Sequence, residues 1–162
     1  YQYKSNINPL TCIADGEVYS FGSNEYGQLG HETAEDSSFP QKIGFYQKFL
    51  LNESGTLQAP RVARIVVGPC HNFALTEDGE IYSWGLGTYG QLGNGKNTLK
   101  QYVPMVINDE GTEFNDNGEE TSNPTAALFP KEKVRKYLQN IIITPGFDCT
   151  FLLVSTTLIE DN

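Results

Sequence analysis

The two histidines and three cysteines are the residues best suited to metal binding or nucleophilic chemistry. Zinc sites bring Cys and His ligands together in closely spaced pairs. Cys12, Cys70 and Cys149 lie far apart, and none belongs to a Cys-x-x-Cys pair. They are interpreted as reduced thiols, half buried in strands. His71 follows a glycine turn and is expected to bond a neighbouring backbone group or hydroxyl, whereas His31 is expected to face water. No metal or catalytic site is predicted.

The glycine-rich strings could suggest a phosphate-binding loop. Gly85-Leu-Gly87-Thr-Tyr-Gly90 matches the dinucleotide fingerprint in its glycine spacing only, because it follows a hairpin and opens no helix. Gly95-Lys96-Asn97 lacks the hydroxyl that would hold magnesium beside a phosphate. No cofactor is predicted.

An internal repeat explains these glycines better. The segment from Asp15 to Gly30 recurs from Asp78 to Gly93 with identity at 11 of 16 positions. Such self-similarity is typical of repeat architectures. In each copy, apolar residues alternate around an Asp-Gly pair, which predicts a β-hairpin with a type I′ turn. Each hairpin is followed by Gly-Gln-Leu-Gly, which predicts a second turn whose Leu enters the core.

A third, partial copy begins near the end of the chain. Residues 140–153 align with 65–75 when Gly146 is matched to Gly68. Long segments separate the copies: 31–60 is polar with a short aromatic cluster, and 109–120 is an acidic run. Both are expected to be loops projecting from the array. Residues 131–139 are expected to form one short helix.

The pattern Asp-Gly-x-[Val/Ile]-Tyr-Ser-[Phe/Trp]-Gly-x-x-x-Tyr-Gly-Gln-Leu-Gly, preceded by Gly-x-x-His-x-x-Ala-Leu, resembles the regulator of chromosome condensation repeat family. The resemblance implies an all-β fold made of antiparallel blades of a seven-bladed β-propeller. The residues that carry the repeat signature are Asp15, Gly16, Gly22, Gly27, Gly30, Gly68, His71, Asp78, Gly79, Trp84, Gly85, Gly90, Gly93 and Gly146.

Two full repeats and partial ones cannot close a ring, because a propeller needs about four blades or more. The chain is therefore expected to be an incomplete arc with long loop insertions. The remaining blades would come from the same gene or from another chain. The expected divisions are a first blade at about 1–60 with an insertion at 31–60, a second at about 61–107, an acidic insertion at 108–130 and a partial blade at 131–162.

Charge restricts the partners. The chain has 20 acidic and 11 basic residues and a net charge of −9, which disfavours direct nucleic-acid and membrane binding. No apolar stretch is long enough to span a membrane. The odd, scattered cysteines suggest an intracellular protein, placed in the nucleus or cytoplasm. The acidic run is either a solvated loop or an electrostatic guide for a basic partner such as a histone.

The family resemblance implies several functions. We expect a protein-interaction propeller, with no catalytic activity in this chain. The alternatives are a guanine-nucleotide exchange factor for a Ran-like small GTPase and a substrate or scaffold module of a ubiquitin ligase. A plant ultraviolet receptor of this family uses clustered tryptophans, whereas Trp84 stands alone here. The expected interaction loops contain Ser23, Asn24, Glu25, Tyr26, His31, Leu86, Thr88, Tyr89 and Asn94.

Overall fold

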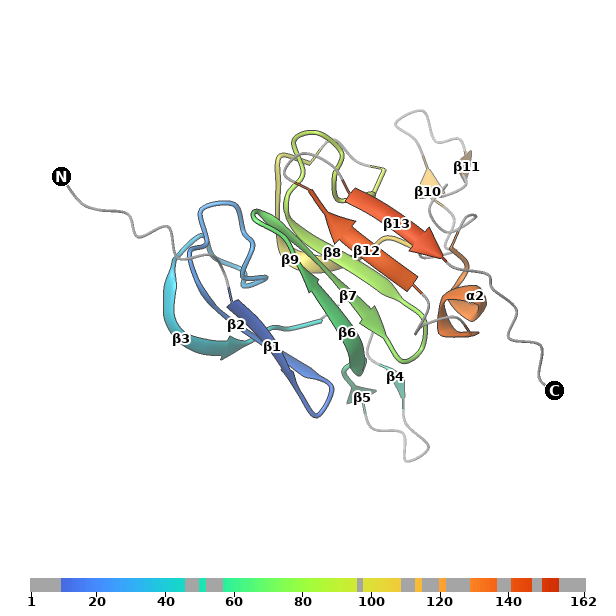
Figure 1. Cartoon of the computed structure of the whole chain (residues 1–162), viewed down its shortest axis with the longest axis horizontal. Coiled ribbons are helices and arrows are strands. Elements are labelled where there is room, and N and C mark those ends of the chain that lie inside the picture. Colours follow the sequence, from blue (N-terminus) through green and yellow to red (C-terminus); the bar gives the residue numbers. More distant parts are fainter. Residues whose placement is uncertain are drawn as a thin grey trace.

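A four-stranded antiparallel sheet lies at the centre of the molecule (Figure 1). The computed structural model describes residues 10–45, 50–51, 57–95, 98–108, 113–114, 120–121, 129–136, 141–146 and 150–154. The central sheet has the order β6-β7-β8-β9, and its strands are β6 (Val62–Val67), β7 (His71–Thr76), β8 (Ile81–Leu86) and β9 (Lys100–Val106). Every residue of β7 is buried, because neighbouring sheets cover both of its faces.

A three-stranded sheet repeats most of this arrangement. It has the order β1-β2-β3, formed by β1 (Leu10–Ala14), β2 (Glu17–Gly22) and β3 (Ser37–Lys42). The β1-β2 hairpin corresponds to β7-β8, and β3 corresponds to β9. The register of β2 against β3 shifts between Ser20 and Gly22, as β8 against β9 shifts between Ser83 and Gly85. The same bulge therefore recurs in both blades.

A third sheet and a short helix follow. β12 (Ile141–Pro145) pairs with β13 (Thr150–Val154) as β6 pairs with β7. Helix α2 (Lys131–Lys136) lies within the segment where one helix was predicted, and residues 137–139 of that prediction lie outside the described residues. Within the described part of the chain, no helix has the length and apolar character needed to cross a bilayer.

The segments predicted to be projecting loops contain strands. β3 falls inside 31–60, so the loop interpretation of that stretch was wrong for Ser37–Lys42. The same stretch holds a two-strand hairpin, β4 (Leu50–Leu51) with β5 (Leu57–Gln58). The acidic stretch holds another, β10 (Glu113–Phe114) with β11 (Glu120–Thr121). β3, the counterpart of β9 in the first blade, thus comes from sequence without alternating apolar residues.

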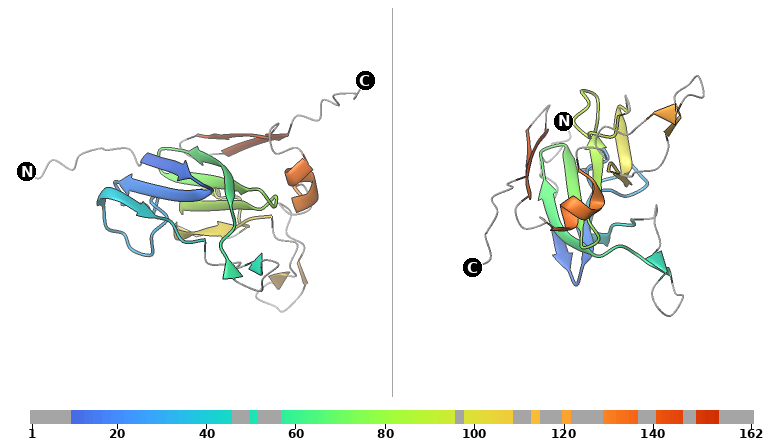
Figure 2. Two further views of the ribbon diagram at one scale, coloured as in Figure 1. Left: turned by 90° about the horizontal axis from the view of Figure 1, so that it is seen from below. Right: turned by 90° about the vertical axis from the view of Figure 1, so that its right-hand side faces the viewer.

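Two hydrophobic cores fill the spaces between the sheets. β1 contacts β6 on one side, and β12 contacts β6 and β7 on the other (Figure 2). The core between the first and second sheets consists of Val18, Ile43, Phe45, Val62, Ala74, Tyr82 and Trp84. The core between the second and third consists of Phe73, Leu75, Ile81, Ile107, Val134, Ile141 and Ile143. Burying each Val, Ile, Leu or Phe side chain in these cores stabilises the fold by about 1.5–3 kcal/mol.

The turns of the two Asp-Gly hairpins differ in length by one residue. Asp15 and Gly16 both have positive φ, 53° and 79°, and they join Ala14 directly to Glu17, as a type I′ turn does. In the second hairpin only Gly79 has positive φ, and a bond from the Gly79 N–H to the Thr76 carbonyl closes a longer turn. The type I′ prediction is therefore wrong for Asp78-Gly79, where three residues separate the Thr76 and Glu80 pair.

Candidate functional site

The loop that follows β2 is held by one buried asparagine. The Asn24 side chain is completely buried. Its Oδ1 accepts the Leu29 N–H at 2.9 Å, and its Nδ2 donates to the Thr33 carbonyl at 2.6 Å. Its backbone N–H donates to Asp36 Oδ1 at 2.7 Å. Asn24 was predicted to contact a partner, but these bonds turn it inward and make it the internal brace of the loop.

The Gly-Gln-Leu-Gly turns are built identically in the two blades. Gln28 Oε1 accepts the Tyr26 N–H, and Gln91 Oε1 accepts the Tyr89 N–H, both at 2.8 Å. The last glycine of each turn donates to the carbonyl of the first at 3.1 Å. The leucine of each turn is buried, as predicted. Each turn is therefore fixed by its glutamine side chain as well as by its backbone.

A backbone carbonyl joins the first blade to the second. The Gln28 carbonyl accepts Asn72 Nδ2 at 2.6 Å and Trp84 Nε1 at 3.0 Å. Trp84 is fully buried, and its ring lies edge-on to that of Phe45, with centroids 6.2 Å apart. The Trp84 indole thus fills the core between the blades and holds the preceding turn with its N–H.

Lys100, the first residue of β9, contacts the loop that follows β2. Its Nζ donates to the Glu25 carbonyl at 2.8 Å and lies 5.4 Å from the centroid of the Tyr26 ring. This distance is within the range of a cation–π interaction. The first loop is therefore seated against β9 of the second blade.

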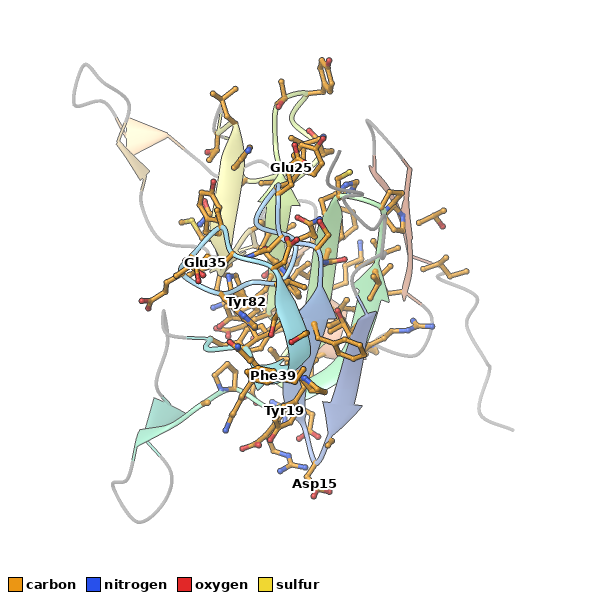
Figure 3. All side chains as sticks on the ribbon, turned by 90° about the vertical axis from the view of Figure 1, so that its left-hand side faces the viewer. Asp15, Tyr19, Glu25, Glu35, Phe39 and Tyr82 are labelled. Carbon is orange, nitrogen blue, oxygen red and sulfur yellow. The ribbon has the colours of Figure 1, made fainter. Side chains whose placement is uncertain are left out.

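The exposed residues of these loops lie toward one end of the sheets, and we call this region the rim. Figure 3 shows Glu25 at this end and Asp15 at the opposite end. Glu25, Thr88 and Tyr89 are exposed, while Ser23, Tyr26 and Leu86 are half-buried and Asn94, like Asn24, is buried. Further exposed residues on the same loops were not predicted from the sequence, and they include Glu32, Glu35, Asp36 and Leu99. Glu35 and Leu99 lie just before β3 and β9, and the repeat did not reveal the positions of these two strands.

The two histidines do not form a common site. His31 is half-buried, with Nε2 3.0 Å from Ser20 Oγ, so the prediction that it simply faces water was wrong. Burial lowers the pKa of His31, opposed by a bond with the backbone of Gln41 that raises it. His71 is fully buried and packs edge-on against Phe73, and burial lowers its pKa. In the described ranges, no group of three or more His, Cys, Asp or Glu side chains is placed to hold a metal ion.

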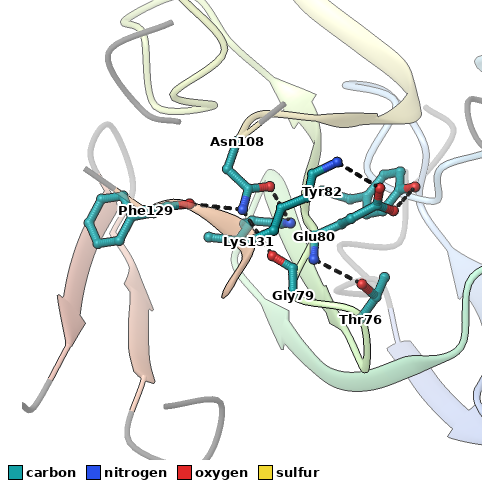
Figure 4. A network of polar contacts seen from close by, with 8 residues as sticks. Thr76, Gly79, Glu80, Tyr82, Asn108, Phe129 and Lys131 are labelled. Atoms are coloured by element: carbon teal, nitrogen blue, oxygen red, sulfur yellow. Dashed lines mark hydrogen bonds and ion pairs between the residues drawn. The ribbon is translucent and has the colours of Figure 1, made fainter. Parts of the chain in front are cut away.

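A buried polar network lies at the opposite end of the second blade (Figure 4). Asn108 Oδ1 accepts the Ile81 N–H at 2.8 Å, and its Nδ2 donates to the carbonyls of Gly79 and Phe129 at 2.9 and 3.0 Å. Asn108 therefore ties the hairpin turn to the segment that leads into α2. The sequence did not reveal this role, because Asn108 stands at the border of the acidic insertion.

The same network holds a buried carboxylate. Glu80 accepts Lys131 Nζ at 3.1 Å and the Tyr82 hydroxyl at 2.8 Å, and it is 3% exposed. The first blade has the corresponding arrangement at Glu17, where Lys42 and Tyr19 supply the same two donors on the surface. These donors lower the pKa of Glu17, and Lys42 has the larger effect. Both clusters are placed to stabilise the hairpin ends.

The repeated geometry matches a known family. The family model of the Regulator of chromosome condensation (RCC1) repeat matches residues 15–75 and 78–125, and a second RCC1-repeat model matches residues 62–91. The chain belongs to this family. The crystal structure of human WBSCR16 has the same fold, with a TM-score of 0.51 and 23% identity, over 67% of this chain and 24% of that one. The sheets of this RCC1-repeat chain are accordingly antiparallel blades of a β-propeller.

Curated RCC1-repeat relatives are much longer than this chain. The Ultraviolet-B receptor UVR8 of Arabidopsis thaliana is 39% identical over 104 residues, which are 64% of this chain and 21% of UVR8. The E3 ubiquitin-protein ligase HERC2 of Homo sapiens is 38% identical over 92 residues, which are 57% of this chain and 2% of HERC2. The chain therefore matches about a fifth or less of the length of these relatives.

The RCC1 signature glycines occupy places that other residues would strain. Gly22 and Gly85 stand at the repeated bulge with φ of 115° and 105°. A Cβ at Gly85 would overlap the Cys70 carbonyl oxygen and lie 2.7 Å from the Cα of His71. Since the atoms in the way are backbone, no side-chain rotation could relieve the overlap. A side chain at Gly85 would therefore strain the backbone and clash with it.

Proposed function

We propose that this chain forms part of a protein-interaction propeller whose rim binds a partner protein. The observation that carries the proposal is the construction of the first rim loop. Hydrogen bonds with the Asn24 and Gln28 side chains fix its backbone, while Glu25, Glu32 and Glu35 remain exposed on it. A loop that is already ordered loses little conformational entropy on binding, and rigid scaffolds commonly present recognition residues on such loops.

The partner we propose is a protein with a basic surface, such as a histone or a small GTPase. Four carboxylates, those of Glu25, Glu32, Glu35 and Asp36, lie exposed on one braced loop of a chain whose net charge is −9. Such a surface attracts basic partners and speeds their association, by an amount that falls as salt is added. The acidic run 109–120 would strengthen the same field.

The test compares two triple variants of the full-length protein. In the rim variant, Glu25, Glu32 and Glu35 become Gln. In the control, three exposed carboxylates at the Asp-Gly end of the second blade are neutralised, as Glu77→Gln, Asp78→Asn and Glu132→Gln. Association rates with a core histone dimer and with Ran are measured across a salt series.

The expected result is that only the rim variant associates more slowly and loses its salt dependence. Equal rates for both variants and the wild type would refute the rim as the binding surface, as would failure of both partners to bind. Release of fluorescent GDP from the same Ran preparation tests the exchange-factor alternative, since unchanged release would eliminate it.

A second candidate function is a scaffold module within a ubiquitin ligase. The 38% identity to HERC2 favours it. The complete open reading frame decides this candidate, because a ligase requires a catalytic domain in the same polypeptide or in a stable partner. A reading frame with no such domain, together with no co-purifying ligase, would remove it.

A further inference from the structure

The Asp-Gly hairpin ends of the two blades are alike in sequence but differ in what covers them. In the second blade, helix α2 lies directly on the Asp78-Gly79 turn. A Cβ built at Gly79 would overlap the Lys131 carbonyl oxygen and lie 3.0 Å from the Arg135 nitrogen. Gly79 is buried beneath this helix. The second hairpin end is therefore closed by helical backbone.

The first hairpin end has no such cover among the described residues. The three atoms nearest to a Cβ built at Gly16 all belong to the Arg61 side chain, at 3.2–3.4 Å. The side chain of Glu17 is 45% exposed, whereas that of its counterpart Glu80 is 4% exposed. Residues 57–61 lead from β5 into β6 without a helix. In the part of the chain that the structure describes, no helical backbone therefore lies on the first turn.

A cavity of about 240 Å³ lies at this hairpin end. A cavity of about 150 Å³ can bind a benzene-sized group, so this one can admit a branched aliphatic side chain. Val18 and Ile43 form part of its wall. The backbone hydrogen bond that joins them, 2.8 Å long, recurs between Ile81 and Ile107 in the second blade. There, Val134 of α2 lies in one core with both isoleucines. The cavity thus borders the counterparts of the residues onto which α2 packs.

The mouth of the cavity is charged. Its exposed residues include Asp15, Glu17, Lys42 and Arg61. Lys42 binds Glu17 at 2.5 Å, and Arg61 lies 3.5 Å from Glu77. The three carboxylates of this group exceed its two cations, which favours a basic partner. The long, exposed pair of Arg61 contributes little stability, so this side chain can leave the turn at little cost.

We propose that this cavity docks a short amphipathic helix of a partner protein, which lies on the Asp15-Gly16 turn as α2 lies on Asp78-Gly79. An aliphatic side chain of that helix enters the cavity, and a lysine or arginine on the same face pairs with Asp15. Arg61 moves away from Gly16 to admit the helical backbone. Figure 3 shows Asp15 at the end of the sheets away from Glu25, so this docking site is separate from the rim.

The helix α2 of a second copy is a poorer occupant. Its Val134 is 1% exposed, and its Lys131 already binds Glu80, so it would have to leave its own blade first. The sequence of α2 instead provides a template for the partner. In that template, Lys133 and Arg135 flank the buried aliphatic residue.

A fluorescently labelled peptide with the sequence of residues 130–139 serves as the probe. Isolated helices this short are marginal in water, so a side-chain cross-link on the exposed face holds the helix. Its binding to the full-length protein is measured by fluorescence anisotropy. We expect saturable binding, weakened roughly tenfold or more in a control peptide with Val134→Asp, because burying a carboxylate is costly. Equal binding of the two peptides overturns the proposal, as does no binding of either.

Three single variants of the full-length protein locate the binding surface. Ala59→Trp fills the cavity from an exposed lining position and should weaken peptide binding. Arg61→Ala uncovers Gly16 and should strengthen it, an effect that a purely structural role of Arg61 would not produce. Ala34→Trp, at an exposed position of the first rim loop, is the matched control and should leave binding unchanged. Binding that is insensitive to Ala59→Trp, or that is lost with Ala34→Trp, overturns the proposal.

Photo-cross-linking separates the cavity from the site of α2. A photo-leucine takes the place of Val134 in the peptide, and mass spectrometry identifies the attached residues. We expect cross-links to residues 15–18, 42–45 and 59–61, which line the cavity or lie between lining residues. Cross-links confined to residues 77–81 would show that the peptide displaces α2 from the second blade, and would overturn the proposal.

Discussion

Replacing Gly85 by Ala should be among the most damaging single-methyl changes in the chain. Positive φ costs an L-residue about 1–2 kcal/mol. The new Cβ would also overlap the Cys70 carbonyl and crowd the Cα of His71 at 2.7 Å, and forcing a methyl group into a packed site costs about 1–3 kcal/mol. The sum, about 2–5 kcal/mol, is a large part of the roughly 5–15 kcal/mol by which typical domains are stable.

Gly95→Ala isolates the steric part of this cost. Gly95 also has positive φ, 68°, but a Cβ there meets no atom of the described residues within 4 Å. Only the conformational cost of about 1–2 kcal/mol should therefore appear. Urea unfolding followed by fluorescence suits the comparison, because Trp84 is the only tryptophan and is fully buried. If Gly85→Ala costs no more than Gly95→Ala, the close approach of the Cys70 carbonyl is not the constraint on this glycine.

Three further changes test the blade joint, the hairpin network and the histidines. Trp84→Phe keeps an aromatic ring but removes the bond to the Gln28 carbonyl, and should cost about 1–2 kcal/mol in urea unfolding followed by circular dichroism. Asn108→Ala leaves buried partners of three hydrogen bonds unmatched and should cost about 3 kcal/mol in the same assay. Burial holds the pKa of His71 and His31 below the usual 6.5, so the unfolded chain binds more protons near that pH. The free energy of unfolding should be highest above pH 6.5 and fall as pH drops through it, and His71→Gln should flatten the profile.

Each of these expectations has a clear contrary result. If Trp84→Phe leaves the urea midpoint of unfolding unchanged, the bond from Asn72 alone holds the turn at Gln28. An Asn108→Ala variant as stable as the wild type would show that these three hydrogen bonds contribute little. A pH profile that is the same with and without His71 would assign the acid sensitivity to other groups.

The sequence predicted those parts of the fold that depend on local signals. The β1-β2 and β7-β8 hairpins follow from apolar alternation around Asp-Gly, and the buried Leu29 and Leu92 follow from the turn pattern. β3 was missed because five of its six residues are exposed and it includes Pro40, so no apolar period marks it. Its pairing depends instead on a bulge with β2, which is a non-local contact.

The rim was predicted only in outline, for a related reason. The sequence indicated which loops could carry interaction residues, but it could not distinguish a side chain that faces out from one that braces the loop. Asn24 and Glu25 are adjacent and both polar, yet Asn24 is buried and Glu25 is exposed. The difference arises from the Thr33 and Asp36 partners of Asn24, which only the folded loop brings into reach.

The joint at the Gln28 carbonyl has an evolutionary consequence. Asn72 and Trp84 grip the main chain of their neighbour, and every residue type offers the same carbonyl. A blade can therefore be duplicated, exchanged or separated by a long insertion without a compensating substitution in the neighbouring blade. Genes built from such units can lengthen by copying and diversify their exposed loops afterwards, while the contacts that assemble the ring stay the same.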